Sequence, residues 1–245
     1  MPAIYDDDSR LGSLLYDKGE KTLIAIDKRL KTIAGFVTHG GFAVDVGTDH
    51  GYLAIYLVES GRSKKALATD VREMPLQSAK QNIAEHLLGE KINTMLTDGL
   101  TGVELGGVTD IIVAGMGGIL ISEILEARHP LGGKNLVLQP MTQAGHLRQW
   151  LCQNGYNILE EAPAFVGDKA YCVIHAQYDG VVRDSDELFC LVGKIPQSKG
   201  EDVERYLAHI EQKLLKKAAG LKKSGKEPEE LRRTLDLVDK LGRKR

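Results

Sequence analysis

Three aspartates stand in or directly after short apolar runs in the first half of the chain. Asp45 lies in the first of these runs, and Asp70 and Asp98 end the next two. Apolar runs of this length predict buried strands of a parallel sheet. Because the carboxyl ends of parallel strands open on one edge, we expect the three carboxylates to converge on one crevice. A crevice lined by carboxylates suits a ligand that carries positive charge.

The turn after the first run reads Gly47-Thr-Asp-His-Gly51. Its glycine spacing differs from the Gly-x-Gly-x-x-Gly pattern of dinucleotide sites. Asp45 and Asp49 flank the turn and would repel a pyrophosphate at the helix N-terminus. S-adenosylmethionine, which carries an ammonium, a sulfonium and a nucleoside but no phosphate, fits these charges. The turn alone is equally consistent with an ordinary strand–helix connection that Asp49 caps.

Each acid has a role in such a site. Asp70 comes about 20 residues after the glycine turn, where a carboxylate accepts hydrogen bonds from the two ribose hydroxyls. Asp98 would face the exocyclic amine of adenine, although Asp98-Gly99 also suits a plain turn. No pair of histidines has ligand spacing, so we predict no metal site.

Two further motifs end later apolar runs. Ala114-Gly-Met-Gly-Gly118 ends the fourth run, and its glycines allow close approach of the backbone to a flat ring. Tight packing of helix on strand would explain them equally well. Gln139-Pro140 ends the fifth run and offers a fixed amide group beside the same crevice.

The elements that hold these residues alternate between strand and helix. Strands are predicted at 42–46, 65–70, 92–98, 110–115 and 135–140, and an antiparallel pair at 156–161 and 170–178. Helices are predicted at 20–37, 52–60, 75–88, 119–127 and 143–154. This alternation predicts an α/β, Rossmann-like, doubly wound and mainly parallel sheet.

The pattern changes from Lys199 onward. Apolar residues recur at spacings of three and four on both sides of a break at 224–228, which predicts a small C-terminal coiled-coil hairpin of two α-helices. We therefore expect a cofactor-binding domain at 1–183 and a hairpin domain at 184–245. Residues 1–19 show no firm periodicity.

Charge is distributed unevenly along the chain. Residues 199–245 hold 14 Lys and Arg against 9 Asp and Glu, whereas the rest holds 18 against 25. A basic end on an acidic body suggests a polyanionic partner, although a solvated Lys-rich hairpin is an equal alternative. No apolar run approaches the roughly 20 residues that span a membrane. The three cysteines lack Cys-x-x-Cys spacing, so we predict a cytoplasmic protein without disulfides.

Seven short motifs carry a family resemblance. They are Asp27-Lys-Arg-Leu30, Asp45-Val-Gly-Thr-Asp-His-Gly-Tyr-Leu53, Gln77-Ser-Ala79, Asp98-Gly-Leu100, Ala114-Gly-Met-Gly-Gly118, Leu138-Gln-Pro140 and Leu147-Arg-Gln-Trp-Leu151. In order and spacing they resemble the bacterial tRNA (adenine-N1)-methyltransferase family that modifies adenine 22. The resemblance covers about residues 20–178. It implies a class I methyltransferase that uses S-adenosylmethionine as cofactor and tRNA as partner, and we expect it to act as a monomer.

The resemblance also implies site residues. The expected cofactor-binding residues are Asp45, Gly47, Asp70, Asp98, Gly115 and Met116. For the target base, we expect Asp49 or Gln139 to accept from the exocyclic amine and Tyr52 to contact the ring. The expected substrate-binding residues are Lys28, Arg29, His50, Gly117, Gly118, Pro140, Lys213, Lys216, Lys217, Lys222 and Lys223. One departure concerns the base: Met141 stands where the family usually has Asn.

Four other functions stay open. If the chain methylated a small molecule, the basic hairpin would have no role. If it methylated another RNA, the hairpin could still bind that RNA. A non-catalytic RNA-binding protein on this fold would bind tRNA but not S-adenosylmethionine. A nicotinamide oxidoreductase is disfavoured by the acids in the glycine turn.

Overall fold

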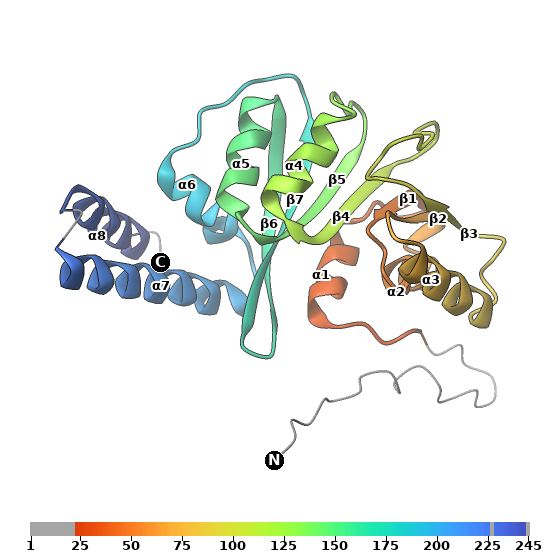
Figure 1. Cartoon of the computed structure of the whole chain (residues 1–245), viewed down its shortest axis with the longest axis horizontal. Coiled ribbons are helices and arrows are strands. Elements are labelled where there is room, and N and C mark those ends of the chain that lie inside the picture. Colours follow the sequence, from red (N-terminus) through yellow and green to blue (C-terminus); the bar gives the residue numbers. More distant parts are fainter. Residues whose placement is uncertain (1–22, 226–227, 244–245) are drawn as a thin grey trace, which may run out of the picture.

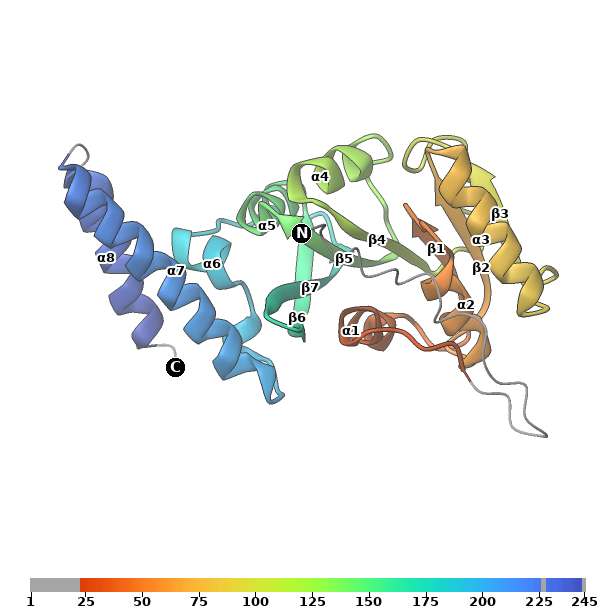
Figure 2. The same ribbon diagram turned by 60° about the horizontal axis from the view of Figure 1, so that its bottom comes forward.

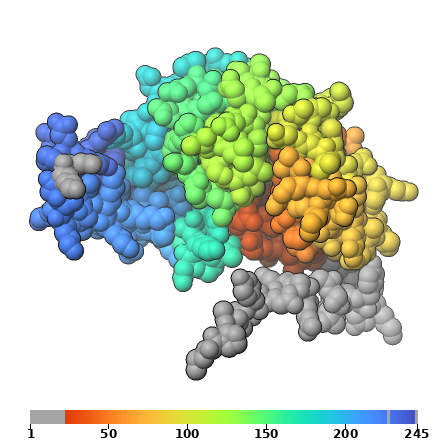
Figure 3. All heavy atoms as spheres, in the orientation of Figure 1, coloured from red at the N-terminus to blue at the C-terminus, as the bar shows by residue number. Residues whose placement is uncertain are grey.

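The chain folds into a sheet with helices on both faces and a helical hairpin at one end (Figure 1). This computed structural model describes residues 23–225 and 228–243 of the 245-residue chain. The space-filling view shows the hairpin, in blue, standing out from the body of the molecule (Figure 3).

Seven strands form one sheet in the order β3-β2-β1-β4-β5-β7-β6. They are β1 (Gly41–Val46), β2 (Ser63–Asp70), β3 (Ile92–Leu96), β4 (Asp110–Gly117), β5 (Asn135–Thr142), β6 (Tyr156–Val166) and β7 (Lys169–Tyr178). Strands β1 to β5 pair in parallel, and β7 is antiparallel to both β5 and β6. The predicted mainly parallel sheet with an antiparallel edge pair is therefore confirmed.

The helices cover both faces of the sheet. They are α1 (Lys28–Phe36), α2 (Tyr52–Glu59), α3 (Glu73–Glu85), α4 (Gly118–Glu126), α5 (Ala144–Gln153), α6 (Glu187–Val192), the 3-10 helix η2 (Ile195–Gln197), α7 (Asp202–Ser224) and α8 (Pro228–Gly242). On one face Ile33 of α1 and Leu57 of α2 share an apolar core with Ile112 of β4. On the other face Ile121 of α4 and Leu147 of α5 pack in a second core (Figure 2).

Helix α1 begins at Lys28, not at Glu20 as predicted. The carboxylate of Asp27 accepts a hydrogen bond of 2.8 Å from the backbone N–H of Leu30, which caps the helix. The preceding residues 23–27 are not helical, and the N–H of Ile24 donates to Glu59 at 2.8 Å. The prediction started too early because it relied on the spacing of apolar residues, which continues across this cap. The first three residues of the prediction, 20–22, lie outside the described residues.

Strand β6, helix α6 and the 3-10 helix η2 also differ from the prediction. Strand β6 continues to Val166, beyond the predicted end at Glu161. Glu161 lies inside the fold because it forms a buried ion pair of 2.8 Å with Arg148 of α5, so a charged residue interrupts the apolar pattern that marks a strand. Helix α6 and η2 were not predicted, since six and three residues are too few to show a helical period.

The two long C-terminal helices pack together as the predicted hairpin. Gly225 ends α7 in the left-handed conformation (φ 62°), and its N–H donates to the carbonyl of Leu221. The base of the hairpin is joined to the sheet, because Val203 and Leu207 share an apolar cluster with Phe165 of β6. The division into domains at residue 183 stays a prediction.

Candidate functional site

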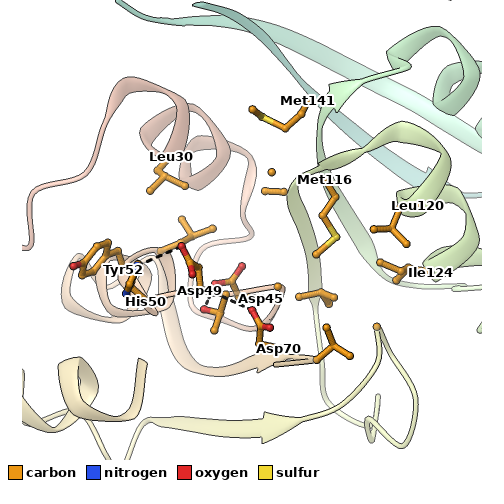
Figure 4. Close-up of a pocket in the computed structure, with 18 of the residues that line it drawn as sticks. Leu30, Asp45, Asp49, His50, Tyr52, Asp70, Met116, Leu120, Ile124 and Met141 are labelled. Carbon is orange, nitrogen blue, oxygen red and sulfur yellow. Dashed lines mark hydrogen bonds and ion pairs between the residues drawn. The ribbon is translucent and has the colours of Figure 1, made fainter. Parts of the chain in front are cut away.

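A cavity of about 590 Å³ opens at the carboxyl ends of the parallel strands (Figure 4). It lies where β1 and β4 are neighbours and their following helices cover opposite faces of the sheet, the usual ligand crevice of such folds. Asp45, Asp70 and Asp98 all line this cavity. The structure therefore brings together the three carboxylates that the strand pattern predicted to converge.

The glycine turn after β1 forms the floor of the cavity. Gly47 has φ 75°, and its N–H and that of Thr48 both donate to the carbonyl of Thr69 on β2 at 2.8 Å. Gly51 has φ 76°, and a Cβ atom there would lie 3.2 Å from Cβ of Ala79. These two positions need glycine because both backbones are left-handed and both face a close neighbour, which for Gly47 is the side chain of Met116.

Asp45 is a buried carboxylate at the base of the cavity, with 4% of its surface exposed. The hydroxyl of Thr48 donates to its Oδ2 at 2.6 Å. Burial raises the pKa of Asp45 to about 6, although Thr48 and the positive charge of Arg29 partly oppose the shift. A buried carboxylate in this state gains stabilisation from a cationic ligand.

Asp70 ends β2, and its carboxylate is held by backbone groups. The N–H of Arg72 donates to Oδ1 at 2.9 Å, and the N–H of Asp49 lies 3.4 Å from Oδ2. These two hydrogen bonds fix the orientation of the Asp70 carboxylate at the cavity wall. Asp98 follows β3 instead of ending it, and together with Gly99 it lines the same wall.

Tyr52 and His50 stand at the mouth of the cavity. The two rings stack with their centroids 5.5 Å apart and an angle of 25° between their planes. The carboxylate of Asp49 lies 3.5 Å from Nε2 of His50. Because Tyr52 is 41% exposed, this ring pair offers a flat surface to a ligand that arrives from solvent.

Apolar side chains line two sides of the cavity. Leu30 of α1 lies on the side of Tyr52 and His50, whereas Met116 of β4, Leu120 and Ile124 of α4 and Met141 of β5 lie across from them (Figure 4). Of these, only Met116 was among the predicted site residues. The others were missed because apolar residues on helices give no sign of facing a cavity until the fold is known. Met141 carried a signal, since it replaces the usual Asn of the motif.

Gln139 lies behind the wall, and it was predicted to contact the base. Gln139 is fully buried, and the cavity-lining residues of the described chain do not include it. Its Oε1 accepts from Nη1 of Arg29 at 2.9 Å, and its Nε2 donates to the carbonyl of Pro140 at 3.0 Å. Both ends of the amide are thus bonded within the protein, and a direct contact of Gln139 with the base stays a prediction.

Arg29, which was predicted to bind the substrate, lines the cavity from α1. Its guanidinium lies 5.8 Å from the ring centre of Tyr171 on β7 and 3.9 Å from the carboxylate of Asp27. Neither Asp27 nor Tyr171 was predicted to be a site residue. The helix cap Asp27 and two strands distant in the sequence, β5 and β7, therefore hold one positive charge in the cavity wall.

The remaining predicted substrate residues lie elsewhere. Gly117, Gly118 and Pro140 are near the cavity in sequence but are absent from its described lining. Lys28 forms ion pairs with Glu201 and Asp202. The predicted hairpin lysines are all exposed on α7, at the end of the molecule away from the cavity (Figure 1); they are Lys213, Lys216, Lys217, Lys222 and Lys223.

S-adenosylmethionine fits the groups that line the cavity. Asp45 and Asp70 supply buried carboxylates for an ammonium and for ribose hydroxyls, and Leu120 and Ile124 supply apolar surface for a nucleobase. Within residues 23–225 and 228–243, no group of three His, Cys, Asp or Glu side chains could hold a metal ion. No helix in this part of the chain is long and apolar enough to cross a membrane.

Comparison with known proteins identifies relatives of the chain. Residues 26–174 match the model of a family described as "Methyltransferase domain". The tRNA (adenine(22)-N(1))-methyltransferase of Bacillus subtilis is 35% identical over 167 residues, which cover 64% of this chain and 70% of the relative.

Solved structures extend the similarity over most of the chain. Streptococcus pneumoniae Sp1610, solved in complex with S-adenosyl-L-methionine, is 33% identical with a TM-score of 0.76, covering 89% of this chain and 99% of its own. TrmK of M. capricolum, solved with the product S-adenosyl-homocysteine, is 25% identical with a TM-score of 0.73, covering 91% and 97%.

Proposed function

Because this chain belongs to the family of the tRNA (adenine(22)-N(1))-methyltransferases, we propose that it transfers a methyl group from S-adenosylmethionine to N1 of adenine 22 in tRNA. The observation that carries the proposal is the convergence of Asp45, Asp70 and Asp98 on one cavity. S-adenosylmethionine, when bound, supplies a methyl group on a positively charged sulfur that a nitrogen lone pair can accept.

The carboxylates would hold the cofactor by its polar groups. Asp45 would face the ammonium, because its buried carboxylate lacks a full positive partner. Asp70 is oriented by two backbone N–H groups and would accept the ribose hydroxyls. Asp98 would accept from the exocyclic amine of the adenine. Gly47, Gly115 and Met116 bring the backbone of two strand ends to the same side of the cavity.

The target base has to leave its helix before it can react. Adenine N1 is part of the Watson–Crick edge, so unpairing or flipping costs a few kcal/mol. The exposed ring of Tyr52, stacked on His50, offers a stacking partner worth roughly 1–3 kcal/mol. Asp49, exposed beside them, would accept from the exocyclic amine of the target.

Alignment is the main catalytic task of these residues. The lone pair of N1 is free at neutral pH, so the reaction needs no strong base. Holding the nucleophile in line with the transferred group can lower the barrier by roughly 7–11 kcal/mol. The apolar side chains of Leu30 and Met116 would limit the access of water to the reacting atoms.

The hairpin supplies positive charge for the rest of the tRNA. Lys213, Lys216, Lys222 and Lys223 are exposed on α7, where they would contact phosphates. Lys217 is paired with Glu230 at 2.6 Å and contributes less. We propose that the protein acts as a monomer in the cytoplasm, where its three free cysteines would stay reduced.

Methyl transfer to defined tRNA tests the proposal. Unmodified tRNA with adenine 22 should acquire label from S-adenosylmethionine and a reverse-transcription stop at that position. A matched tRNA with 1-deazaadenosine at position 22, which lacks the acceptor nitrogen, should acquire neither. Label at another base, label only on a small molecule, or tRNA binding without binding of S-adenosylhomocysteine would each overturn the proposal in favour of one of the other functions.

A further inference from the structure

Neighbouring residues at the start of α1 contact two different parts of the molecule. Nζ of Lys28 lies 2.8 Å from Oε1 of Glu201 and 2.8 Å from Oδ2 of Asp202. Arg29, the next residue, lines the cavity and bonds Gln139. Since Asp202 is the first residue of α7 and Glu201 is its N-cap, one turn of α1 touches both the hairpin and the cavity wall.

The charges around Lys28 make it a poor ligand for a phosphate. Its hydrogen bonds with Asp202 and then Glu201 raise the pKa of Lys28, so the amine stays protonated and paired. The three side chains together carry a net negative charge. Glu201 is 86% exposed at its side chain, so an approaching phosphate would meet a carboxylate.

Asp202 lies at the point where the hairpin joins the body. Its side chain is only 11% exposed, and the next residue, Val203, is buried in the cluster that contains Phe165 of β6. Arg205, one turn of α7 further on, covers the ring of Phe165 at 3.8 Å. The base of α7 is thus held by the sheet on one side and by Lys28 on the other.

We propose that Lys28 is a positioning residue that sets the direction of the hairpin relative to the cavity by pairing with Glu201 and Asp202. The inference rests on the proposed function, because this direction affects methylation only when one tRNA contacts both the hairpin and the cavity. Lys28 then acts on tRNA through the hairpin and makes no phosphate contact of its own. This differs from the role expected from the family resemblance.

The two roles predict opposite effects of removing a carboxylate. If Lys28 positions the hairpin, Lys28→Met and Asp202→Asn each weaken tRNA binding about two- to five-fold, the range for a partly exposed ion pair. The double variant binds tRNA no more weakly than Lys28→Met, because Lys28→Met already removes the contact with Asp202. If Lys28 binds phosphate, Asp202→Asn removes one of its two carboxylate partners, so tRNA binding becomes tighter and its salt dependence steeper.

The measurement is tRNA affinity by fluorescence anisotropy over a series of salt concentrations. Lys31→Met is the matched control, since it removes an exposed lysine from the same helix. Tighter binding by Asp202→Asn, or a loss in the double variant equal to the sum of both, overturns the proposal. If Lys28→Met leaves the salt dependence of tRNA binding unchanged, the result supports the positioning role of Lys28.

Kinetics separate positioning from loss of structure. Lys28→Met should raise KM for tRNA about two- to five-fold, leave kcat within two-fold, and leave the affinity for S-adenosylhomocysteine unchanged in calorimetry. A fall in that affinity would mean that α1 has lost its fold, and the proposal would then be overturned.

A distance measurement tests the pairing without tRNA or methylation. Spin labels carried by unnatural amino acids at Lys80 on α3 and Gln212 on α7, both exposed, report the hairpin direction in the full chain. Lys28→Met and Asp202→Asn should broaden the distance distribution, and Lys31→Met should not. An unchanged distribution would refute the inference even if tRNA is methylated. A broadened one would support it even if the substrate proves to be another RNA.

Discussion

Nη1 of Arg29 donates a hydrogen bond of 2.9 Å to Oε1 of Gln139 and so joins α1 to the end of β5 behind the cavity wall. This bond holds a positive charge on the side of the cavity where Asp45 is buried. Arg29 lowers the pKa of Asp45 against the larger effect of burial, which raises it to about 6. Cofactor affinity should therefore depend on pH in a way that can be traced to these residues.

Affinity for S-adenosylhomocysteine should fall as the pH is lowered through about 6. The reason is that the ligand's ammonium favours the ionised form of Asp45, whose pKa in the free protein is about 6. Above that pH the carboxylate is already ionised, so affinity should be level. Calorimetry between pH 5 and pH 8 measures this. In Asp45→Asn the dependence near pH 6 should disappear, and its persistence would show that another group titrates.

In Arg29→Met, the pH at which affinity for S-adenosylhomocysteine falls should be higher than in the wild type. Without the guanidinium, burial acts on Asp45 with less opposition, so its pKa rises and affinity is lost at a higher pH. Gln139→Leu should move it in the same direction by less, because Arg29 remains but loses its fixed orientation. Calorimetry on both variants gives the two midpoints. A midpoint that falls in Arg29→Met would contradict the assigned effect of its charge.

Asp70→Ala should weaken binding of S-adenosylhomocysteine by about 10- to 100-fold. Hydrogen bonds to a charged group contribute roughly 1.5–3 kcal/mol, and this carboxylate is already oriented for its ligand by the N–H of Arg72. Asp70→Asn keeps one acceptor oxygen and should lose less. If the wild type and Asp70→Ala bound S-adenosylhomocysteine with equal affinity, the proposed contact between Asp70 and the ribose would be wrong.

The strand ends were predictable from the sequence, because strands that alternate with helices form a parallel sheet. In such a sheet the acids at the carboxyl ends of the strands meet at one edge. Asp45, Asp70 and Asp98 were found in this way. Side chains from elements that return to the cavity were not. Tyr171 reaches it from β7, which lies between β5 and the edge strand β6, and nothing in its sequence neighbourhood marks it.

The direction of a side chain was harder to predict than its position. Gln139 ends β5 at the expected place, yet its amide faces Arg29 instead of the cavity. Lys28 stands in a basic motif, yet its partners are two acids at the start of α7. The nearer of them in sequence, Glu201, is 173 residues away. Motif spacing identifies neighbours along the chain, whereas these contacts depend on how α1 packs against distant elements.

The ion pair between Arg148 and Glu161 should be essential for stability. Both side chains are fully buried, with 2.8 Å between Nη2 and Oε2. Nη1 also donates to the carbonyls of Cys190 and Leu191 in α6. Arg148→Met leaves Glu161 charged and unpaired, so the free energy of unfolding should fall by about 3–5 kcal/mol.

Chemical denaturation measures this loss, and the double variant Arg148→Met/Glu161→Met is its control. Removing both charges should recover most of the stability, because the cost comes mainly from the unpaired carboxylate. A loss below about 1 kcal/mol in Arg148→Met would indicate that water reaches Glu161.

Neutralising the exposed lysines of α7 should weaken tRNA binding and make it less dependent on salt. The set to replace by alanine is Lys213, Lys216, Lys222 and Lys223. Each lost phosphate contact lowers the slope of log K against log salt by about 0.9, so the combined variant should lose about three to four in slope. KM for tRNA should rise while kcat changes little, because the cavity is untouched. The control is Lys80→Ala/Lys91→Ala, two exposed lysines on the body. If that control lost as much slope as the hairpin variant, tRNA would bind along the body and not along α7.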